Sequence, residues 1–318
     1  MGERRIGVII SGAARVWLLA AALATAMAGP ARAWNDHGHM VIAAAAYDRL
    51  TPATRARVDA LLALNRYPVN GSNDAGAGLA GKARFMQAAT APDAIKRDGS
   101  YQDDGNEPPP SAQAGRNTGF DDRLMHKYWH YRDIPFSTDG TPLHAAPAVN
   151  AQERIGLFRR TIASDAPDAL KAYDLVWLLH LVADVHQPLH ATSRYSRAQP
   201  RGDAGGNRVM VCAPACTIRL HGYWDDILGT GQSVSAAMAD AAMLPTPDAA
   251  LARRMGEAEW VRESFEVARA VVYAPPIGPG PGPFTLTAGY AAAARAQAGR
   301  QAAMAASRLA RLLDAELK

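Results

Sequence analysis

The chain has 318 residues, of which 48% are hydrophobic and 20% charged, and this composition excludes a disordered or collagen-like protein. The formal net charge is +4 at pH 7, but residues 1–33 contribute four arginines against one glutamate, so about +1 remains for the rest. Proteins that bind polyanions over a broad basic surface usually carry more positive charge. We therefore expect any phosphate recognition to be concentrated in one site, where bound cations could supply it.

The N-terminal segment has the pattern of a signal peptide. Arg4 and Arg5 precede an apolar run over residues 16–28, which closes on the small-residue cleavage pattern Ala31-Arg32-Ala33. A membrane anchor is the alternative, but the apolar run is shorter than the roughly 20 residues that a span needs. We expect residues 1–33 to be removed, the mature domain to cover residues 34–318, and the protein to be secreted or periplasmic. The sequence leaves the export route open.

Helical patterns dominate the mature chain from its start. Residues 40–47 are rich in helix formers, and the pattern breaks at Thr51-Pro52. A second pattern begins after Pro52 and fades near residues 67–68, where a loop with glycine and asparagine follows at 70–76. A long loop is expected over residues 97–122, because three successive prolines interrupt it.

The C-terminal two thirds of the chain continue the helical reading. Further helices are predicted over residues 151–163, 167–185, 235–243, 248–272 and 290–317. Pro188 ends the second of these, and the proline-glycine run at 275–283 predicts a stiff loop. Alternating apolar residues around 209–220 predict a small β-hairpin. The fold class is therefore all-α, with one small β-hairpin in a single domain.

Cys212 and Cys216 are the two cysteines of the chain, and Ala-Pro-Ala separates them. In an oxidising compartment such a pair most simply closes a small disulfide loop. A zinc ribbon would need two further ligands at short spacing.

The strongest local motif lies on the helix predicted at 167–185. His180 and Asp184 are four residues apart, so both side chains lie on one helical face, close enough to bind one cation. Asp184 has two oxygens and could bridge to a second cation, while His190, beyond Pro188, could reach a neighbouring one. Imidazole and carboxylate groups are costly to bury in an apolar helix unless they are paired or metal-bound. For His186 we favour a hydrogen-bonded core residue.

Other candidate ligands are scattered along the chain. His221 and Asp225 repeat the four-residue spacing, His130 lies in a Trp-His-Tyr block, and Asp93 follows a proline. Alone, each could be an ordinary surface or capping residue. Cleavage after Ala33 would also give Trp34 a free α-amine, which loses its proton to a metal more readily than a lysine does.

Taken together, these motifs resemble the zinc-dependent single-strand-specific nucleases of the S-one/P-one type, from Trp34 to near the C-terminus. Six motifs occur in order: Trp34 followed by Gly38-His39, the isolated Asp93, Trp129-His130-Tyr131, the helix from His180 to His190, Gly205-Gly206-Asn207, and Leu220-His221 with Trp224-Asp225. Each is weak alone, and the ordered set is specific. The resemblance implies a mainly α-helical domain of the phospholipase C and P-one nuclease type.

The resemblance also implies three zinc ions held by nine residues. Asp93, His130, His180 and Asp184 would hold one, Trp34, His39 and the shared Asp184 a second, and His190, His221 and Asp225 the third. Zinc ions so placed would activate water and offset charge on the phosphoryl oxygens. Asp93, Lys96 and Asp184 would be the catalytic residues.

Substrate contacts follow from the same resemblance. Lys96 would contact the phosphate, Tyr131 would stack on a base and Asp133 would hydrogen-bond that base. Stacking requires an unpaired base, which favours single strands. The expected substrates are single-stranded DNA, single-stranded RNA and 3′-nucleotides, and the products carry a 5′-phosphate. We expect a monomer without stable membrane association.

Two departures and two alternatives accompany this interpretation. His37 and the loop over residues 97–122 do not belong to the family pattern, so cleft shape and substrate range stay open. A zinc-dependent phospholipase C would share the fold and the metal arrangement, but those enzymes use Glu where this chain has Asp225. A non-catalytic zinc-binding or storage protein would gain little from nine ligands drawn from distant segments.

Overall fold

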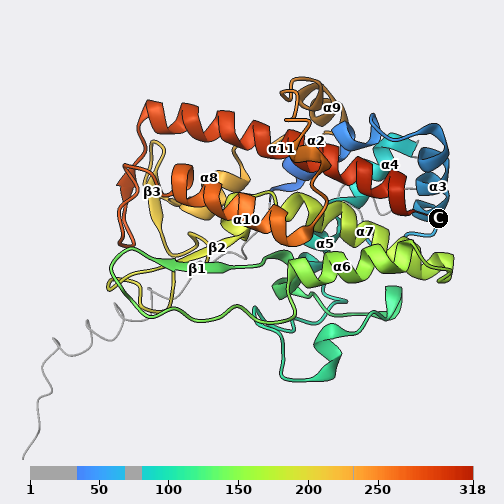
Figure 1. Cartoon of the computed structure of the whole chain (residues 1–318), viewed down its shortest axis with the longest axis horizontal. Coiled ribbons are helices and arrows are strands. Elements are labelled where there is room, and N and C mark those ends of the chain that lie inside the picture. The colour runs from blue at the N-terminus through green and yellow to red at the C-terminus, as the bar shows by residue number, and fades with distance from the viewer. Residues whose placement is uncertain (1–33, 69–80, 232, 318) are drawn as a thin grey trace, which may run out of the picture. The chain divides into compact units, whose positions relative to one another are not determined.

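A computed structural model of the chain describes residues 34–68, 81–231 and 233–317 (Figure 1). The segment predicted as a signal peptide and the loop predicted at 70–76 lie outside these residues. The described part is predominantly helical, as the sequence predicts. No helix within it is both long and apolar enough to cross a membrane.

The first helices follow Trp34, which is fully buried in the core. Helix α2 (Asp36–Tyr47) begins four residues earlier than its predicted start, because Asn35 caps it by accepting from the backbone N–H of Gly38. Thr51 caps α3 (Pro52–Leu62), which ends sooner than predicted. Helix α4 (Gly81–Ala88) and the short α5 (Ala91–Ala94) were not predicted. Too few apolar residues repeat in these short elements to give a helical period.

Helix α7 (Asp168–Asp184) is confirmed where residues 167–185 predicted it, and it is central to the fold. Every residue from Lys171 to Asp184 is buried, and the helix packs against α6 (Ala151–Ile162), α3 and α11 (Ala288–Glu316). Figure 1 shows α6 running alongside α7, with α11 and α2 on the other side. Pro188 opens a 3-10 turn, Pro188–His190, directly after α7. The last turn of α7 therefore places polar side chains in the buried interior of the protein.

Two small sheets flank the helices. Strands β3 (Met210–Cys212) and β4 (Ile218–Arg219) pair antiparallel around the Cys212–Cys216 disulfide, so the predicted hairpin and disulfide are confirmed. β5 (Phe284–Thr285) adds to β3 in parallel. A parallel pair, β1 (Ile134–Ser137) with β2 (Thr192–Tyr195), was not predicted. Pairing between segments so far apart in sequence leaves no local signal.

The remaining helices complete the C-terminal half. Helix α8 (Leu220–Asp225) follows β4 directly, and α9 (Val234–Ala242) matches its predicted segment. The helix predicted over 248–272 begins only at α10 (Glu257–Val267), which a π-helical turn, Ala268–Val272, continues. The early start was wrong because Gly256 is extended and serves as the N-cap. The stretch before it holds only the 3-10 turn Leu251–Arg253.

Candidate metal centre

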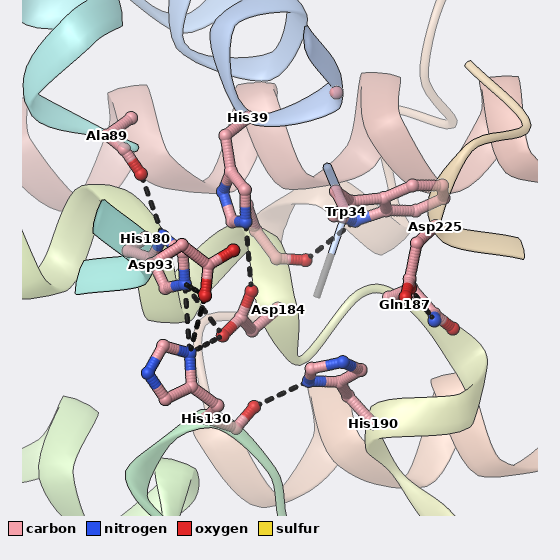
Figure 2. A network of polar contacts seen from close by, with 12 residues as sticks. Trp34, His39, Ala89, Asp93, His130, His180, Asp184, Gln187, His190 and Asp225 are labelled. Carbon is pink, nitrogen blue, oxygen red and sulfur yellow. Dashed lines mark hydrogen bonds and ion pairs between the residues drawn. The ribbon is translucent and has the colours of Figure 1, made fainter. Parts of the chain in front are cut away.

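Four predicted ligands from three distant segments meet at the C-terminal end of α7 (Figure 2). His180 Nε2 lies 2.9 Å from His130 Nδ1 and 3.3 Å from Asp184 Oδ2. Asp93, delivered by α5, places Oδ1 3.8 Å from His180 and 3.9 Å from His130. All four side chains are at most 2% exposed. The structure therefore assembles the set that the resemblance assigned to one zinc.

His39 and Trp34 approach the same carboxylate from the N-terminal segment. His39 Nε2 lies 3.3 Å from Asp184 Oδ1, so the two oxygens of Asp184 face different histidines. Trp34 is fully buried, and its indole Nε1–H donates to the carbonyl oxygen of Ala183 at 3.0 Å. An alanine-sized side chain at position 38 would come within 2.9 Å of the Trp34 Cβ, so Gly38 permits this packing. Trp34 thus lies against the last turn of α7, where Ala183 precedes Asp184.

The third set, from the 3-10 turn after α7 and from α8, lies next to the first. His190 Nε2 is 3.1 Å from His221 Nε2, and His221 Nε2 is 3.6 Å from Asp225 Oδ2. The backbone N–H of Asn35 also donates to the carbonyl oxygen of Asp225 at 3.2 Å. The segment holding Trp34 therefore lies between the two sets.

Backbone carbonyls fix the orientation of three of these histidines. The Nδ1–H of His180 donates to Ala89 at 2.7 Å, that of His190 to His130 at 2.7 Å, and that of His221 to Gly205 at 2.6 Å. Each bond places the ring proton on Nδ1, so Nε2 is the nitrogen that carries the lone pair in the neutral ring. Metal-binding histidines characteristically donate their second nitrogen in this way. All three Nε2 atoms point into the candidate centre.

The Gly-Gly-Asn motif has a steric role in this arrangement. Gly205 has φ +57, and a Cβ there would meet the carbonyl oxygen of Leu189 at 2.4 Å. Only glycine tolerates both the left-handed backbone and this close approach. The turn thereby places the Gly205 carbonyl on His221.

Burial controls the protonation of these groups. Burial lowers the pKa of His180 to about 4 and that of His130 well below its usual 6.5, so both are neutral at pH 7. Burial also raises the pKa of Asp184 to about 7 and that of Asp225 well above its usual 3.8. Asp93 is the exception, because Lys96, His180 and His39 together outweigh the effect of burial and hold its pKa low. Carboxyl groups that are buried this deeply need a nearby cation before they can ionise fully.

The side chains present fit a metal cluster. Buried polar atoms that lack a hydrogen-bond partner among the described residues include both ring nitrogens of His39, Nε2 of His130, Asp93 Oδ2 and Asp184 Oδ1. Such orphaned groups are expensive to bury. Two imidazole lone pairs also face each other across 3.1 Å at His190 and His221, which is repulsive unless positive charge lies between them. A set of cations would satisfy all of these groups.

The grouping by distance differs in one respect from the resemblance. Ligand atoms within 4.8 Å of one another form three groups: His39, His180 and Asp184; Asp93, His130 and His180; and His190, His221 and Asp225. His180 thus belongs to two groups, whereas the resemblance shared only Asp184. The eight histidines and aspartates in these groups are all residues that the resemblance names, and Trp34, its ninth residue, is not in any group.

The predicted substrate-binding residues lie around this cluster. Lys96 Nζ donates to Asp93 Oδ1 at 2.7 Å, and its side chain is 4% exposed. Tyr131 follows His130 directly, and its hydroxyl donates to the carbonyl oxygen of Asn106. Burial and the charge of Asp203 raise the pKa of Asp133 well above its usual 3.8. The loop over residues 97–122, which lies outside the family pattern, therefore contacts the residue expected to stack on a base.

Sequence reasoning missed one residue that supports the centre. Gln187 Nε2 donates to Asp225 Oδ1 at 2.7 Å, while its Oε1 accepts from the backbone N–H of Leu189 at 2.6 Å. It therefore orients Asp225 and holds the turn that carries His190. In the sequence, only its position in the His186-Gln187-Pro188 run pointed to a role for Gln187. His186 is a hydrogen-bonded core residue, as expected, and contacts Val182 and Arg308.

Comparison with known protein families agrees with the resemblance read from the motifs. A family model described as S1/P1 Nuclease matches residues 34–318, nearly the whole chain. No curated protein matches the chain. The match covers every residue of the candidate metal centre.

Proposed function

The chain belongs to the S1/P1 nuclease family, and on this premise we propose that it is a trinuclear zinc phosphodiesterase acting on single-stranded DNA and RNA. Products would carry a 5′-phosphate, and 3′-nucleotides would be a further substrate. Family membership supports a nuclease that hydrolyses phosphodiesters with the help of metal ions. The zinc count, the metal identity and the substrate range are the proposed part.

One observation carries the proposal most directly. Three groups of buried histidine and aspartate ligands lie close together, and buried atoms of His39, His130, Asp93 and Asp184 lack a hydrogen-bond partner among the described residues. Imidazole nitrogen and carboxylate oxygen form the donor set that zinc prefers. Trp34, His39, Asp93, His130, His180, Asp184, His190, His221 and Asp225 are the proposed ligands. Zinc ions bound there would supply Lewis acidity, making water a nucleophile near neutral pH and offsetting charge on phosphoryl oxygens.

The remaining chemistry falls to the residues of the chain. Lys96 is held by Asp93 with its ammonium group at the edge of the cluster, where it can donate to a phosphate oxygen as negative charge develops. Its buried side chain is already ordered, so little conformational entropy is lost during the reaction. We therefore assign Lys96 to transition-state stabilisation and Asp93 to positioning it.

Base recognition is assigned to the segment after His130. Tyr131 offers an aromatic face, and its hydroxyl is fixed by Asn106, so the ring has a defined orientation. Burial and the charge of Asp203 raise the pKa of Asp133 well above its usual 3.8, and this favours a protonated carboxyl group that would both donate to and accept from a base edge. A base stacked on Tyr131 must be unpaired. This arrangement favours single strands.

Processing completes the proposal. Cleavage after Ala33 would give a secreted or periplasmic domain of residues 34–318, with the α-amine of Trp34 as a ligand beside Asp184. We propose the phospholipase C and P-one nuclease type of fold and a monomeric state. The buried position of Trp34 supports a functional role for this residue.

The test is a digestion panel with the mature protein, with and without a chelator. Single-stranded DNA and RNA should be cut much faster than duplexes, chelation should stop cleavage, and zinc should restore it. Release of phosphocholine from lecithin without cleavage of single strands would favour a phospholipase C. Three bound zinc ions with no hydrolysis of nucleic acid or 3′-nucleotides would indicate a zinc-binding protein.

A further inference from the structure

The side chain of Asn35 joins the start of α2 to the segment that follows α8. Its oxygen accepts from the backbone N–H of Gly38 at 2.9 Å, which caps α2. Its Nδ2 donates to Asp226 Oδ1 at 2.8 Å and to the carbonyl oxygen of Gly229 at 2.7 Å. Asn35 is 8% exposed, so water competes little for these bonds. One side chain thus connects segments that are 191 residues apart in the sequence.

Proposed metal ligands lie on both sides of this bridge. On the N-terminal side, Trp34 precedes Asn35, and the carbonyl oxygen of Asn35 accepts from the backbone N–H of His39 at 3.1 Å. On the other side, the backbone N–H of Asn35 donates to the carbonyl oxygen of Asp225 at 3.2 Å, and Asp226 is the C-cap residue of α8. Asn35 is therefore bonded to the backbone of one ligand from each of two metal-binding groups.

The turn that accepts from the Asn35 amide is tightly packed. The backbone N–H of Gly229 donates to the carbonyl oxygen of Asp226 at 3.0 Å, which closes the turn. Gly229 has φ +121, a backbone conformation that favours glycine. A Cβ at this position would lie 3.0 Å from the ring of His37, which belongs to α2. The bridge therefore joins two segments that also pack against each other.

Helix capping alone does not explain asparagine at this position. Serine and aspartate cap a helix about as well, because each offers a side-chain oxygen. The asparagine amide adds two donors, and both are used on the α8 side. A buried donor without an acceptor is costly, so these bonds hold the amide in one geometry. The amide therefore serves the connection between the segments.

We propose that Asn35 is a positioning residue of the metal centre, which holds the ligand groups of His39 and Asp225 at a fixed separation. This inference rests on the proposed zinc centre and is independent of the substrate that the centre cleaves. Ligands that are ordered in advance lose less conformational entropy when the metal binds. Loss of the bridge should therefore weaken binding of the two zinc ions in these groups and spare the ion held by Asp93 and His130.

The test is competition between the zinc-loaded mature protein and a chromophoric chelator, which measures the affinity of each ion. Asn35→Asp keeps the size and the helix cap but replaces both donors with an oxygen that faces Asp226. It should weaken two of the three ions by about tenfold or more, as loss of residues that support ligands typically does. Asn35→Ser, which keeps a cap without adding charge, should act in the same direction. Asn35→Asp combined with Asp226→Asn exchanges donor and acceptor at the wild-type net charge, and should bind zinc more tightly than Asn35→Asp alone.

The identity of the weakened ions separates positioning from general destabilisation. Anomalous diffraction from Asn35→Ser crystals at limiting zinc should show weakened peaks at the groups of His39 and Asp225 and a normal peak beside Asp93. Equal weakening of all three ions would indicate a merely structural role and would overturn the proposal.

Asn150→Asp is the matched control. Asn150 also caps a helix, α6, and its Nδ2 also donates to two oxygens, those of Pro147 and Ala148, but none of its printed side-chain bonds involves a proposed ligand. This variant should lower the free energy of unfolding and leave the three zinc affinities unchanged.

Two variants at Asp226 test the bridge from its other end and decide alone if the Asn35 variants fail to fold. Asp226→Ala removes the acceptor and should weaken the same two ions, whereas Asp226→Asn keeps an acceptor and should change little. Unchanged affinities in the Asn35 variants and in Asp226→Ala, or no recovery in the double variant, would overturn the proposal. A wild type that binds no zinc would overturn it together with the proposed function, while normal zinc binding without cleavage of nucleic acid would concern only the proposed function.

Discussion

Lys96 Nζ lies 2.7 Å from Asp93 Oδ1, and both side chains are almost completely buried at the edge of the metal cluster. Burial opposes ionisation of Asp93, but Lys96, with His180 and His39, outweighs it and holds the pKa of the carboxyl group low. Asp93 is therefore anionic, and Lys96 is fixed on one side of the space where a phosphate would lie. The pair links metal binding to substrate contact.

Replacing Lys96 should separate these two roles. Lys96→Met should lower kcat for single-stranded DNA by on the order of a hundredfold, because one donor to the charge of the transition state is lost. Zinc content should stay close to that of the wild type, since the nine proposed ligands are intact. Steady-state kinetics and metal analysis check this. A kcat within twofold of the wild type would contradict the assigned role.

Substitution of Asp184 should reduce zinc content and activity more than substitution of any other residue of the centre. Its two oxygens face His39 and His130, so Asp184→Asn should remove two metals. Activity should fall by far more than the roughly 10–100-fold typical of residues that only support ligands. Elemental analysis of purified protein gives the metal count. Near-normal zinc content and activity would refute the ligand assignment.

His37 provides the matched control for Asp184. It lies in the same N-terminal segment and is buried, but its Nε2 pairs with Asp240 at 2.8 Å, away from the cluster. His37→Ala should therefore keep its metals and most of its activity. It should lower the free energy of unfolding by about 2 kcal/mol, because a packed, hydrogen-bonded ring is lost. Denaturant titration measures that loss.

The loop over residues 97–122 should respond to pH through His126. Nε2 of His126 lies 2.8 Å from Asp122 and Nδ1 lies 3.1 Å from Asp104, while the ring stacks on Trp129. Burial alone would lower the pKa of His126, but the two carboxylates outweigh it and raise the pKa above its usual 6.5. The extra stability is complete below about pH 6.5 and is lost as pH rises through the raised pKa. Hydrogen exchange of the loop should speed up over that window.

The charged groups around His126 determine the lowest pH at which the loop keeps this extra stability. The pKa of Asp104 is lowered by His126 despite burial, so its contribution is lost as pH falls below about 4. The hydrogen bond from Lys127 lowers the pKa of Asp103, so Asp103 stays ionised across the window, and burial raises the pKa of the Tyr128 hydroxyl above it. His126→Gln should flatten the change above pH 6.5. An unchanged pH profile in this variant would show that another group is responsible.

The position of Trp34 predicts a requirement for accurate processing. Trp34 is fully buried and donates to the carbonyl oxygen of Ala183, the residue before Asp184, and a free α-amine on Trp34 would exist only after cleavage at Ala33. A protein that keeps extra residues before Trp34 should lose about tenfold or more in activity and bind less zinc. Comparison of the two forms of the purified protein checks this. Equal activity would show that the terminal amine is dispensable.

The residues of the metal centre could be predicted far better than the elements around them. His180, Asp184 and His190 stood out because histidine and aspartate side chains are costly to bury unless they are paired or metal-bound. The ordered motifs linked them to Asp93 and His130. Helix α7 was equally clear from its length and apolar content. Short helices such as α4 carry too few residues to show a period.

Features that depend on contacts between distant segments could not be predicted. The role of Gln187 depends on Asp225, which is 38 residues away. Little in the sequence distinguishes Gln187 from other glutamines, because its hydrogen bonds to Asp225 and Leu189 exist only in the folded chain.

The central claim is tested most directly by crystallographic anomalous diffraction at the zinc edge, using mature protein prepared without chelator. The account predicts three zinc peaks in the cluster. Each should lie about 2.0–2.2 Å from its nitrogen and oxygen ligands, and one should be bound to the amine of Trp34. Absence of zinc from these groups in a protein that cleaves single-stranded DNA would contradict the account.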